Sequence, residues 1–374
     1  MKIFIKVSLG CILIASLLWA CGGNDAGDNS QDIRKQQRLV LEGAVLRMMS
    51  PLRENLGESL IALQSKTETF CTVATGSHTS NELEVLQAAW KEVMNLWMKF
   101  QVVRIDPIAH SGLKLSIQFW PDPGNKVGKA AEQIVVSSTA IDQTLISNST
   151  VQSQGLPMLE YLLFSGAAGD PLADLNGSEG VRRCDLLGAV TENLSQLSGA
   201  LHQRWLASND SPPTYPGSDT FATEQAAIDE LVNGMVELLE IVQVKKVGDP
   251  LGGTNSNPQA AESYRSLHSL NNIVQNLVGL RELYLGGQGY GFDDYLSAVV
   301  NRGTVAAEME SLIQQSISAA QTISLPLTNA VLNADQKALV QALEQQILTL
   351  TNYIKADFAD AMNTRIGFNA NDGD

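Results

Sequence analysis

Apolar residues recur at three- and four-residue spacing through most of the chain, whereas alternating runs of β-branched residues are scarce. This period is typical of amphipathic α-helices, which bury their apolar face against neighbours. Two stripes show it clearly: Ile228, Leu231, Val232, Met235, Leu238, Leu239 and Val242, and Val340, Leu343, Ile347, Leu350 and Ile354. The pattern predicts an all-α fold with helices near 31–70 (kinked or broken at Pro51), 81–105, 124–147, 153–165, 179–207, 221–245, 258–286, 303–324 and 334–363.

A proline-rich segment, residues 207–219, interrupts this helical pattern. Its sequence ASNDSPPTYPGSD predicts a linker, because prolines and small polar residues break any helical period. We therefore expect two helical bundles, at 35–206 and 220–374. The glycine-rich stretches 248–255 and 286–291 are expected to be loops, since neither has P-loop or Rossmann spacing.

The N-terminal 20 residues resemble a secretion signal, in which Lys2 and Lys6 precede an apolar run that is short for a transmembrane helix. The string LWAC followed by Gly22 resembles a bacterial lipobox. This predicts lipidation of Cys21, a flexible tether over 21–34 and a position on the periplasmic side of the outer membrane of a Gram-negative bacterium. The alternative is cleavage elsewhere, which would release a soluble periplasmic protein.

The charge balance excludes some partners. The chain has 25 basic and 40 acidic residues and a formal net charge of −15, and removal of residues 1–20 would take away two lysines and no acid. Such acidity opposes binding to nucleic acid, where basic side chains must neutralise phosphates. It also opposes attraction to an anionic membrane surface, so we expect membrane association only through the lipid anchor.

Of the four cysteines, Cys11 would leave with the signal and Cys21 would be lipidated. Cys71 and Cys184 would then remain in an oxidising compartment, which predicts a disulfide between them. Two buried free thiols are the alternative, because free cysteine packs as a small hydrophobic residue.

The usual catalytic motifs are missing from the sequence. Its four histidines, His78, His110, His202 and His268, are far apart along the chain, so no H-E-x-x-H or local zinc pair exists. There is no G-x-S-x-G nucleophile elbow either. The sequence therefore contains no recognisable hydrolytic centre.

Several unusual strings carry candidate site residues. Trp90 and Trp97 are seven residues apart and share one helix face, which is typical of core anchors and also suits a ligand platform. Arg104 and Asp106 follow near the end of this helix. Asp122 in QFWPDPGNKV is expected to be a turn or capping residue, with a ligand role as the alternative.

These strings, together with QGLPMLEYLLFSG at 154–166, KKVGDPLGG at 245–253, AESYRSLHSLNNIVQNLVGLRELYLGGQGYGFDDYL at 261–296 and GFNANDGD at 367–374, resemble the imelysin family in their order. The resemblance covers about residues 35–374. It implies a two-domain, all-helical envelope protein associated with iron uptake. The family name reflects an early assignment as a metallopeptidase.

The family signature G-x-H-x-x-E aligns with Gly155 and Glu160, but Pro157 stands where the pattern has its histidine. Proline cannot ligate a metal through its side chain, so the resemblance implies a weakened site in which Glu160 is the remaining metal candidate. Glu160 lies among leucines, and a buried carboxylate needs a partner. Arg104 or another basic residue of the first bundle is one expected partner. Pro157 is expected to kink its helix.

The second bundle supplies further candidates for a cleft between the bundles, namely Glu262, His268 and Arg281. Together with Trp97, Arg104, Asp106 and Asp122 they form the candidate cleft set, because ligands commonly bind between two lobes. His268 is alternatively a solvated or hydrogen-bonded helix residue. The pair Asp293 and Asp294 is expected to mark a helix start.

Three functions stay open. The preferred one is a non-catalytic periplasmic lipoprotein of iron acquisition that binds a metal, a metal complex or an envelope partner protein at the interface between the bundles. Iron or another divalent cation is the cofactor that the resemblance implies. The alternatives are a metal-dependent peptidase of the imelysin type and a structural interaction protein of the envelope.

Overall fold

The computed structural model describes residues 25–103, 112–167, 169–207 and 221–367. Within these residues the chain is helical and contains no strand. The first half, before the proline-rich segment, contains α1 (Asp25–Glu42), α2 (Ser50–Cys71), α3 (Ser80–Phe100), α4 (Leu113–Ile117), α5 (Lys126–Val136), α6 (Gln143–Asn148), α7 (Leu156–Phe164), α8 (Pro171–Asn176) and α9 (Gly180–Ala207).

The second half contains α10 (Glu224–Glu240), α11 (Asp249–Leu251), α12 (Ser269–Tyr284), α13 (Phe292–Ala298), α14 (Gly303–Thr322), α15 (Leu327–Ala330), α16 (Ala334–Tyr353) and α17 (Ala359–Met362). π-helical turns at Gly43–Met49, Ile241–Gly248 and Ile354–Phe358 extend α1, α10 and α16. The all-α class expected from the apolar period is confirmed.

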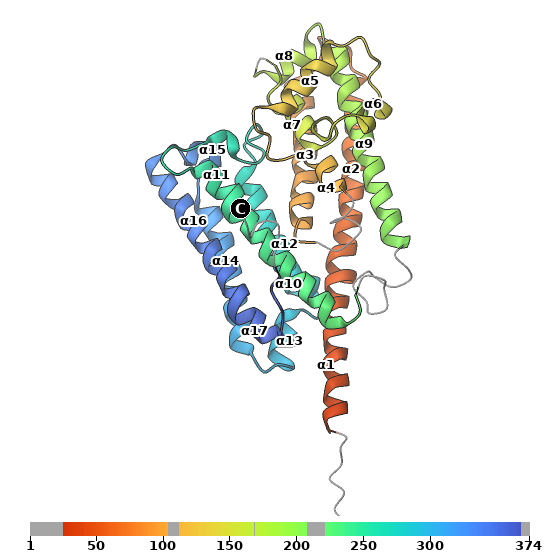
Figure 1. Cartoon of the computed structure of the whole chain (residues 1–374). Coiled ribbons are helices and arrows are strands. Elements are labelled where there is room, and N and C mark those ends of the chain that lie inside the picture. The colour runs from red at the N-terminus through yellow and green to blue at the C-terminus, as the bar shows by residue number, and fades with distance from the viewer. Residues whose placement is uncertain (1–24, 104–111, 168, 208–220, 368–374) are drawn as a thin grey trace, which may run out of the picture.

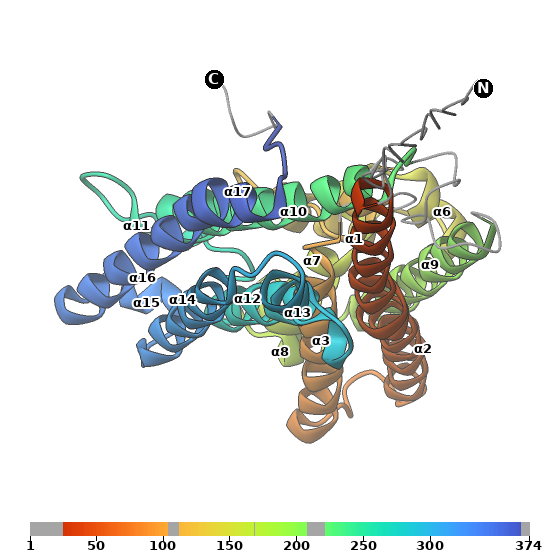
Figure 2. The same cartoon turned by 90° about the horizontal axis from the view of Figure 1, so that it is seen from below.

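The long helices of each half lie side by side (Figure 1). In the first half, α2 packs against α3 and α9, and the short helices α5 to α8 gather at one end. In the second half, α14 packs against α12 and α16. Seen from below, most second-half helices extend to one side of α1 and α2, and α10 reaches α1 and packs against it (Figure 2).

Helix α3 joins the two halves, because it packs along α12 as well as along α2. Buried apolar side chains from both halves form one continuous core. Trp90 and Trp97 lie in it with 1% of their surface exposed, as expected of core anchors. The expected linker falls on residues 207–219, of which 208–219 lie outside the described residues, so the bundle boundaries stay a prediction.

Three expected boundaries were wrong. Residues 25–34, expected to belong to a flexible tether, are part of α1. The expected helix at 31–70 is interrupted by a π-helical turn, and Pro51 sits in the first turn of α2. The expected helix at 124–147 is two helices, because Asp142 is extended and its side chain accepts a hydrogen bond from the Leu145 N–H to start α6.

The expected helix at 258–286 was also wrong in its first part. Only α12, from Ser269 to Tyr284, is α-helical there. Ser263 and Leu267 have φ values of 52° and 57°, a left-handed conformation that ends any α-helix. The segment 261–268 is therefore irregular. Its polar side chains, among them Arg265 and Ser266, reach the first half. Asp294 caps α13 as expected, since it accepts a hydrogen bond from the Gly291 N–H.

Candidate functional site

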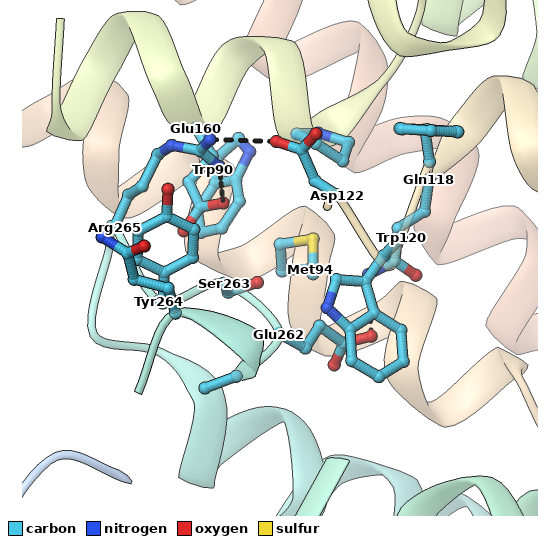
Figure 3. A pocket seen from close by; sticks show the side chains of 14 residues that line it. Trp90, Met94, Gln118, Trp120, Asp122, Glu160, Glu262, Ser263, Tyr264 and Arg265 are labelled. Carbon is cyan, nitrogen blue, oxygen red and sulfur yellow. Dashed lines mark hydrogen bonds and ion pairs between the residues drawn. The ribbon is translucent and has the colours of Figure 1, made fainter. Parts of the chain in front are cut away.

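A small cavity lies where α3, α7 and the segment 118–122 of the first half meet the segment 259–265 of the second (Figure 3). Its volume is ≈ 20 Å³, which is room for about one water molecule. Trp90 and Met94 of α3, Pro157 and Glu160 of α7, and Asp122 line it from the first half. The cavity is therefore built by both halves, and two of the three motif positions, Pro157 and Glu160, line it.

Gly155 precedes α7 and explains why the motif begins with glycine. A Cβ at this position would lie 2.2 Å from the carbonyl oxygen of Ile117, so only a residue without a side chain lets α4 approach so closely. Pro157 is the second residue of α7, in the first turn, where a missing N–H breaks no helical hydrogen bond. The expected kink at Pro157 is therefore wrong.

Glu160 projects from α7 into the cavity with 3% of its surface exposed. Its Oε1 accepts hydrogen bonds from the N–H of Ser266 at 2.9 Å and from the Ser266 hydroxyl at 2.8 Å. Burial raises the pKa of the Glu160 carboxyl, and the Ser266 bonds and the charge of Arg265 oppose this rise. The carboxylate is thus held by the second half of the chain.

Arg265 is the cation beside Glu160, with Nη1 3.9 Å from Oε2. Its Nη2 donates to Asp122 Oδ2 at 3.0 Å and to Asn125 Oδ1 at 2.6 Å, so the guanidinium reaches both carboxylates (Figure 3). The Tyr264 ring packs against it at 4.5 Å. Among the described residues the cation beside Glu160 therefore comes from the second half, whereas Arg104, the expected first-bundle partner, lies outside them.

Asp122 has the capping role that the sequence indicated and also forms an ion pair that it did not indicate. Its Oδ1 accepts hydrogen bonds from the N–H groups of Lys126 and Val127 at the start of α5, as a capping residue does. Its Oδ2 forms the ion pair with Arg265, and the two side chains are 6% and 4% exposed. Asp122 therefore fixes both the local turn and the contact between the halves.

A second buried ion pair joins Glu262 to Lys246. Lys246 Nζ lies 2.9 Å from Glu262 Oε2, and the side chains are 2% and 3% exposed. The same ammonium donates to Gln101 Oε1 at 2.9 Å and to Asn276 Oδ1 at 2.8 Å, which uses its three donors. Burial lowers the pKa of Lys246, and the charge of Glu262 opposes this effect.

Glu262 is equally saturated. Its Oε1 accepts a hydrogen bond from Gln118 Nε2 at 2.9 Å, and its Oε2 accepts one from Asn272 Nδ2 at 2.9 Å besides the bond from Lys246. Gln118 Oε1 in turn accepts a bond from the Trp97 indole N–H at 2.7 Å. These residues form the buried polar network, which connects α3, the segment 118–122, the π-helical turn and α12.

The structure brings together part of the candidate cleft set. Asp122 and Glu262 line the cavity, and Trp97 reaches the same network through Gln118. His268 is the residue before α12; its Nε2 lies 2.9 Å from Asn95 Oδ1, and burial lowers its pKa to about 4. Arg281 instead pairs with Glu310 of α14 at 2.7 Å, away from the cavity lining.

Other expected sites fall elsewhere. Arg104, Asp106 and Cys21 lie outside the described residues. Cys71 at the end of α2 and Cys184 in α9 form a disulfide in the structure, with their Cα atoms 5.5 Å apart. The bridge links two helices of the first half and lies apart from the cavity lining.

The sequence did not indicate the four residues that hold the buried carboxylates, namely Lys246, Arg265, Ser266 and Gln118. A partial signal existed for the network, because Asn272 and Asn276 are four residues apart and fully buried on a face shared with apolar residues. Polar side chains on a buried helix face need polar partners. The identity of those partners was not visible, since they are 9 to 178 residues away along the chain.

The site residues do not fit a divalent cation as they stand. Oxygen ligands for a hard cation must be free to face the ion. The carboxylates of Asp122, Glu160 and Glu262 instead already bind cationic side chains, a hydroxyl or backbone N–H groups of the protein. A cation at this position would meet two resident positive charges. In the described parts of the chain no group of three or more His, Cys, Asp and Glu side chains is arranged to hold a metal ion.

Comparison with known proteins assigns the chain to a family. The sequence model of the Imelysin family matches residues 55–354, which is most of the chain. The chain belongs to the imelysin family. The imelysin match spans both halves and includes Gly155, Pro157, Glu160 and the segment 261–268.

A curated relative and two solved structures are also similar to this imelysin. Iron-regulated protein A of Synechococcus elongatus is 26% identical over 293 residues, which cover 76% of this chain and 72% of the relative. The crystal structure of an imelysin-like protein from Psychrobacter arcticum superposes with a TM-score of 0.73 at 18% identity and covers 90% of this chain and 98% of that one. A putative iron-regulated protein A precursor from Parabacteroides distasonis gives 0.71 at 19% identity, covering 87% and 95%.

Proposed function

We propose that this imelysin is an extracytoplasmic, iron-linked protein that acts as a non-catalytic binding module at the junction of its two halves. The iron link rests on the names of its relatives, iron-regulated protein A among them. The location rests on the signal-like N-terminus, with lipid attachment at Cys21 on the periplasmic side of the outer membrane. No helix in the described part of the chain is long and apolar enough to cross a membrane.

One observation carries the non-catalytic role: the buried carboxylates at the motif are neutralised by the protein's own cations. Arg265 pairs with Asp122 and faces Glu160, and Lys246 pairs with Glu262. A metallopeptidase needs a metal with an open coordination position for water. Here the cavity that Glu160 lines is ≈ 20 Å³ and is bordered by the Arg265 guanidinium. Such an arrangement suits a rigid joint beside a binding surface better than a hydrolytic centre.

Metal uptake tests this role. We expect the purified wild-type protein to retain no stoichiometric iron or zinc after equilibrium dialysis, as measured by elemental analysis. The double variant Pro157→His/Arg265→Gln would restore the motif histidine and remove the resident cation, and we expect it to gain zinc. The single variant Pro157→His is the matched control and should gain less, because Arg265 still faces Glu160.

Two outcomes would contradict the proposal. The first is stoichiometric metal in the wild type that Glu160→Gln removes. The second is peptide cleavage by the wild type, over a broad substrate panel, that a chelator abolishes. The first result would show that the neutralised carboxylates still hold a metal, and the second would favour the metal-dependent peptidase over a non-catalytic module.

A further inference from the structure

A larger cavity adjoins the candidate site and has no role in the argument so far. It shares Gln118, Trp120 and Glu262 with the small cavity, and its volume is ≈ 310 Å³. Its walls come from α4 and the segment 118–121 of the first half and from α10 and the following π-helical turn of the second. This volume and this position between two lobes are typical of small-molecule sites.

Two charged residues that line this larger cavity already have hydrogen-bond partners within the protein. Lys246 and Glu262 both line it, but their mutual ion pair and their amide partners use the ammonium donors and both carboxylate oxygens. A ligand would therefore find a rigid polar base that does not need a further partner. Its binding contacts must come from the walls.

Most of the wall surface is apolar. Leu115, Trp120, Leu238 and Ile241 face the cavity, and half of the Leu115 side chain is exposed. A leucine exposed at the mouth of a cavity gains free energy when an apolar ligand covers it. The indole of Trp120 offers a flat face for an aromatic ring. These walls favour a ligand with an apolar body.

Two further lysines line the cavity. Lys114 and Lys245 line it in a chain whose net charge is −15. Among the described residues, Lys245 pairs with Asp249 at a long distance of 3.7 Å, and the two side chains are 50% and 39% exposed. Exposed pairs of this kind contribute little, so the Lys245 ammonium can take another anionic partner.

Lys245 sets the orientation of a ligand in this cavity. A negative group on the ligand is attracted to the Lys245 ammonium on the cavity wall. Lys245 stands on the π-helical turn Ile241–Gly248, a rare geometry that recurs at functional sites.

We propose that the cavity lined by Leu115, Trp120, Ile241 and Lys245 binds a small organic anion that has an apolar, preferably aromatic, body and a single carboxylate. The apolar body lies against Leu115, Trp120 and Ile241, and the carboxylate faces Lys245. This inference deepens the proposed function, because it rests on the non-catalytic binding role and names the ligand class.

A matched pair of probes tests the charge requirement. We expect 2-naphthoate to bind the full-length protein in isothermal titration calorimetry, and 2-naphthamide, which has the same body without the charge, to bind roughly tenfold more weakly. Equal affinity for the two probes, or no binding of 2-naphthoate at millimolar concentration, would overturn the proposal.

Variants then locate the site. Lys245→Gln should weaken 2-naphthoate binding by roughly fivefold to tenfold and leave 2-naphthamide unchanged. Leu115→Asp should weaken both probes, because it removes apolar wall and adds a negative charge at an exposed position that does not threaten folding. The controls are Lys66→Gln and Leu332→Asp, exposed positions outside the cavity lining, which should bind like the wild type.

Binding that survives both Lys245→Gln and Leu115→Asp would place the probe elsewhere and overturn the assignment. Failure of this proposal is distinguishable from failure of the proposed function. If 2-naphthoate fails to bind, the results of the metal and cleavage measurements stay the same. Chelator-sensitive peptide cleavage by the wild type would contradict the non-catalytic role without changing probe binding at Lys245.

Discussion

Arg265 of the second half faces Glu160 of the first, with Nη1 3.9 Å from Oε2 across a sequence separation of more than a hundred residues. The distance is longer than a hydrogen bond, and Glu160 takes its hydrogen bonds from the neighbouring Ser266. Arg265 instead donates to Asp122. One guanidinium therefore compensates two buried carboxylates and connects the halves at the family motif.

The first prediction concerns removal of this guanidinium. Arg265→Gln should lower the free energy of unfolding by about 3 kcal/mol, because a buried carboxylate that loses its partner keeps its desolvation cost. Chemical denaturation followed by circular dichroism measures the change. The double variant Arg265→Gln/Glu160→Gln should recover part of the loss. Arg204→Gln, at an exposed position of α9, is the control and should have little effect.

The second prediction concerns the pair Lys246 and Glu262. Lys246→Met should destabilise the protein by about 3–5 kcal/mol, since Glu262 would keep its charge in the core without an ammonium. The double variant Lys246→Met/Glu262→Gln should be more stable than Lys246→Met alone. A double-mutant cycle in urea measures the coupling. Additive effects of the two substitutions would mean that the pair is not coupled.

The third prediction is a pH dependence from His268. Burial, with a smaller contribution from Lys91, lowers its pKa from 6.5 to about 4. Between these values the unfolded chain binds more protons than the folded one, so the free energy of unfolding falls as pH drops from 6.5 to 4. In His268→Gln, the midpoint of denaturation should depend less on pH between 4 and 6.5 than it does in the wild type. An unchanged pH profile would show that His268 is not the group responsible.

The fourth prediction concerns Cys71 and Cys184. Intact-mass spectrometry under non-reducing conditions should find no free thiol at either residue. Because the bridge closes a loop with a sequence separation of 113 residues, the variant Cys71→Ser/Cys184→Ser should lose roughly 2–5 kcal/mol of stability. Reduction of the wild type should give a similar loss and should leave the double serine variant unchanged. Free thiols at both positions would contradict the pairing.

The sequence by itself determined the helical class, the long helices and several of the buried positions. The apolar period fixed the long helices, such as α10 and α16, because the positions that must be buried recur once per turn. It also indicated that Trp90 and Trp97 lie in the core and that Glu160, among leucines, is buried. The motif string alone indicated Gly155, Pro157 and Glu160 as site residues.

Only the tertiary structure decided what these residues do together. Segment 261–268 has the composition of a helix, yet it is irregular because Ser263 and Leu267 take left-handed conformations that bring Glu262, Arg265 and Ser266 to the first half. Buried charges choose partners by distance in space, and sequence spacing carries no information about a contact between Glu160 and Arg265. The desolvation cost of the carboxylates required a cation, and packing of α3 against α12 determined which cation reached them.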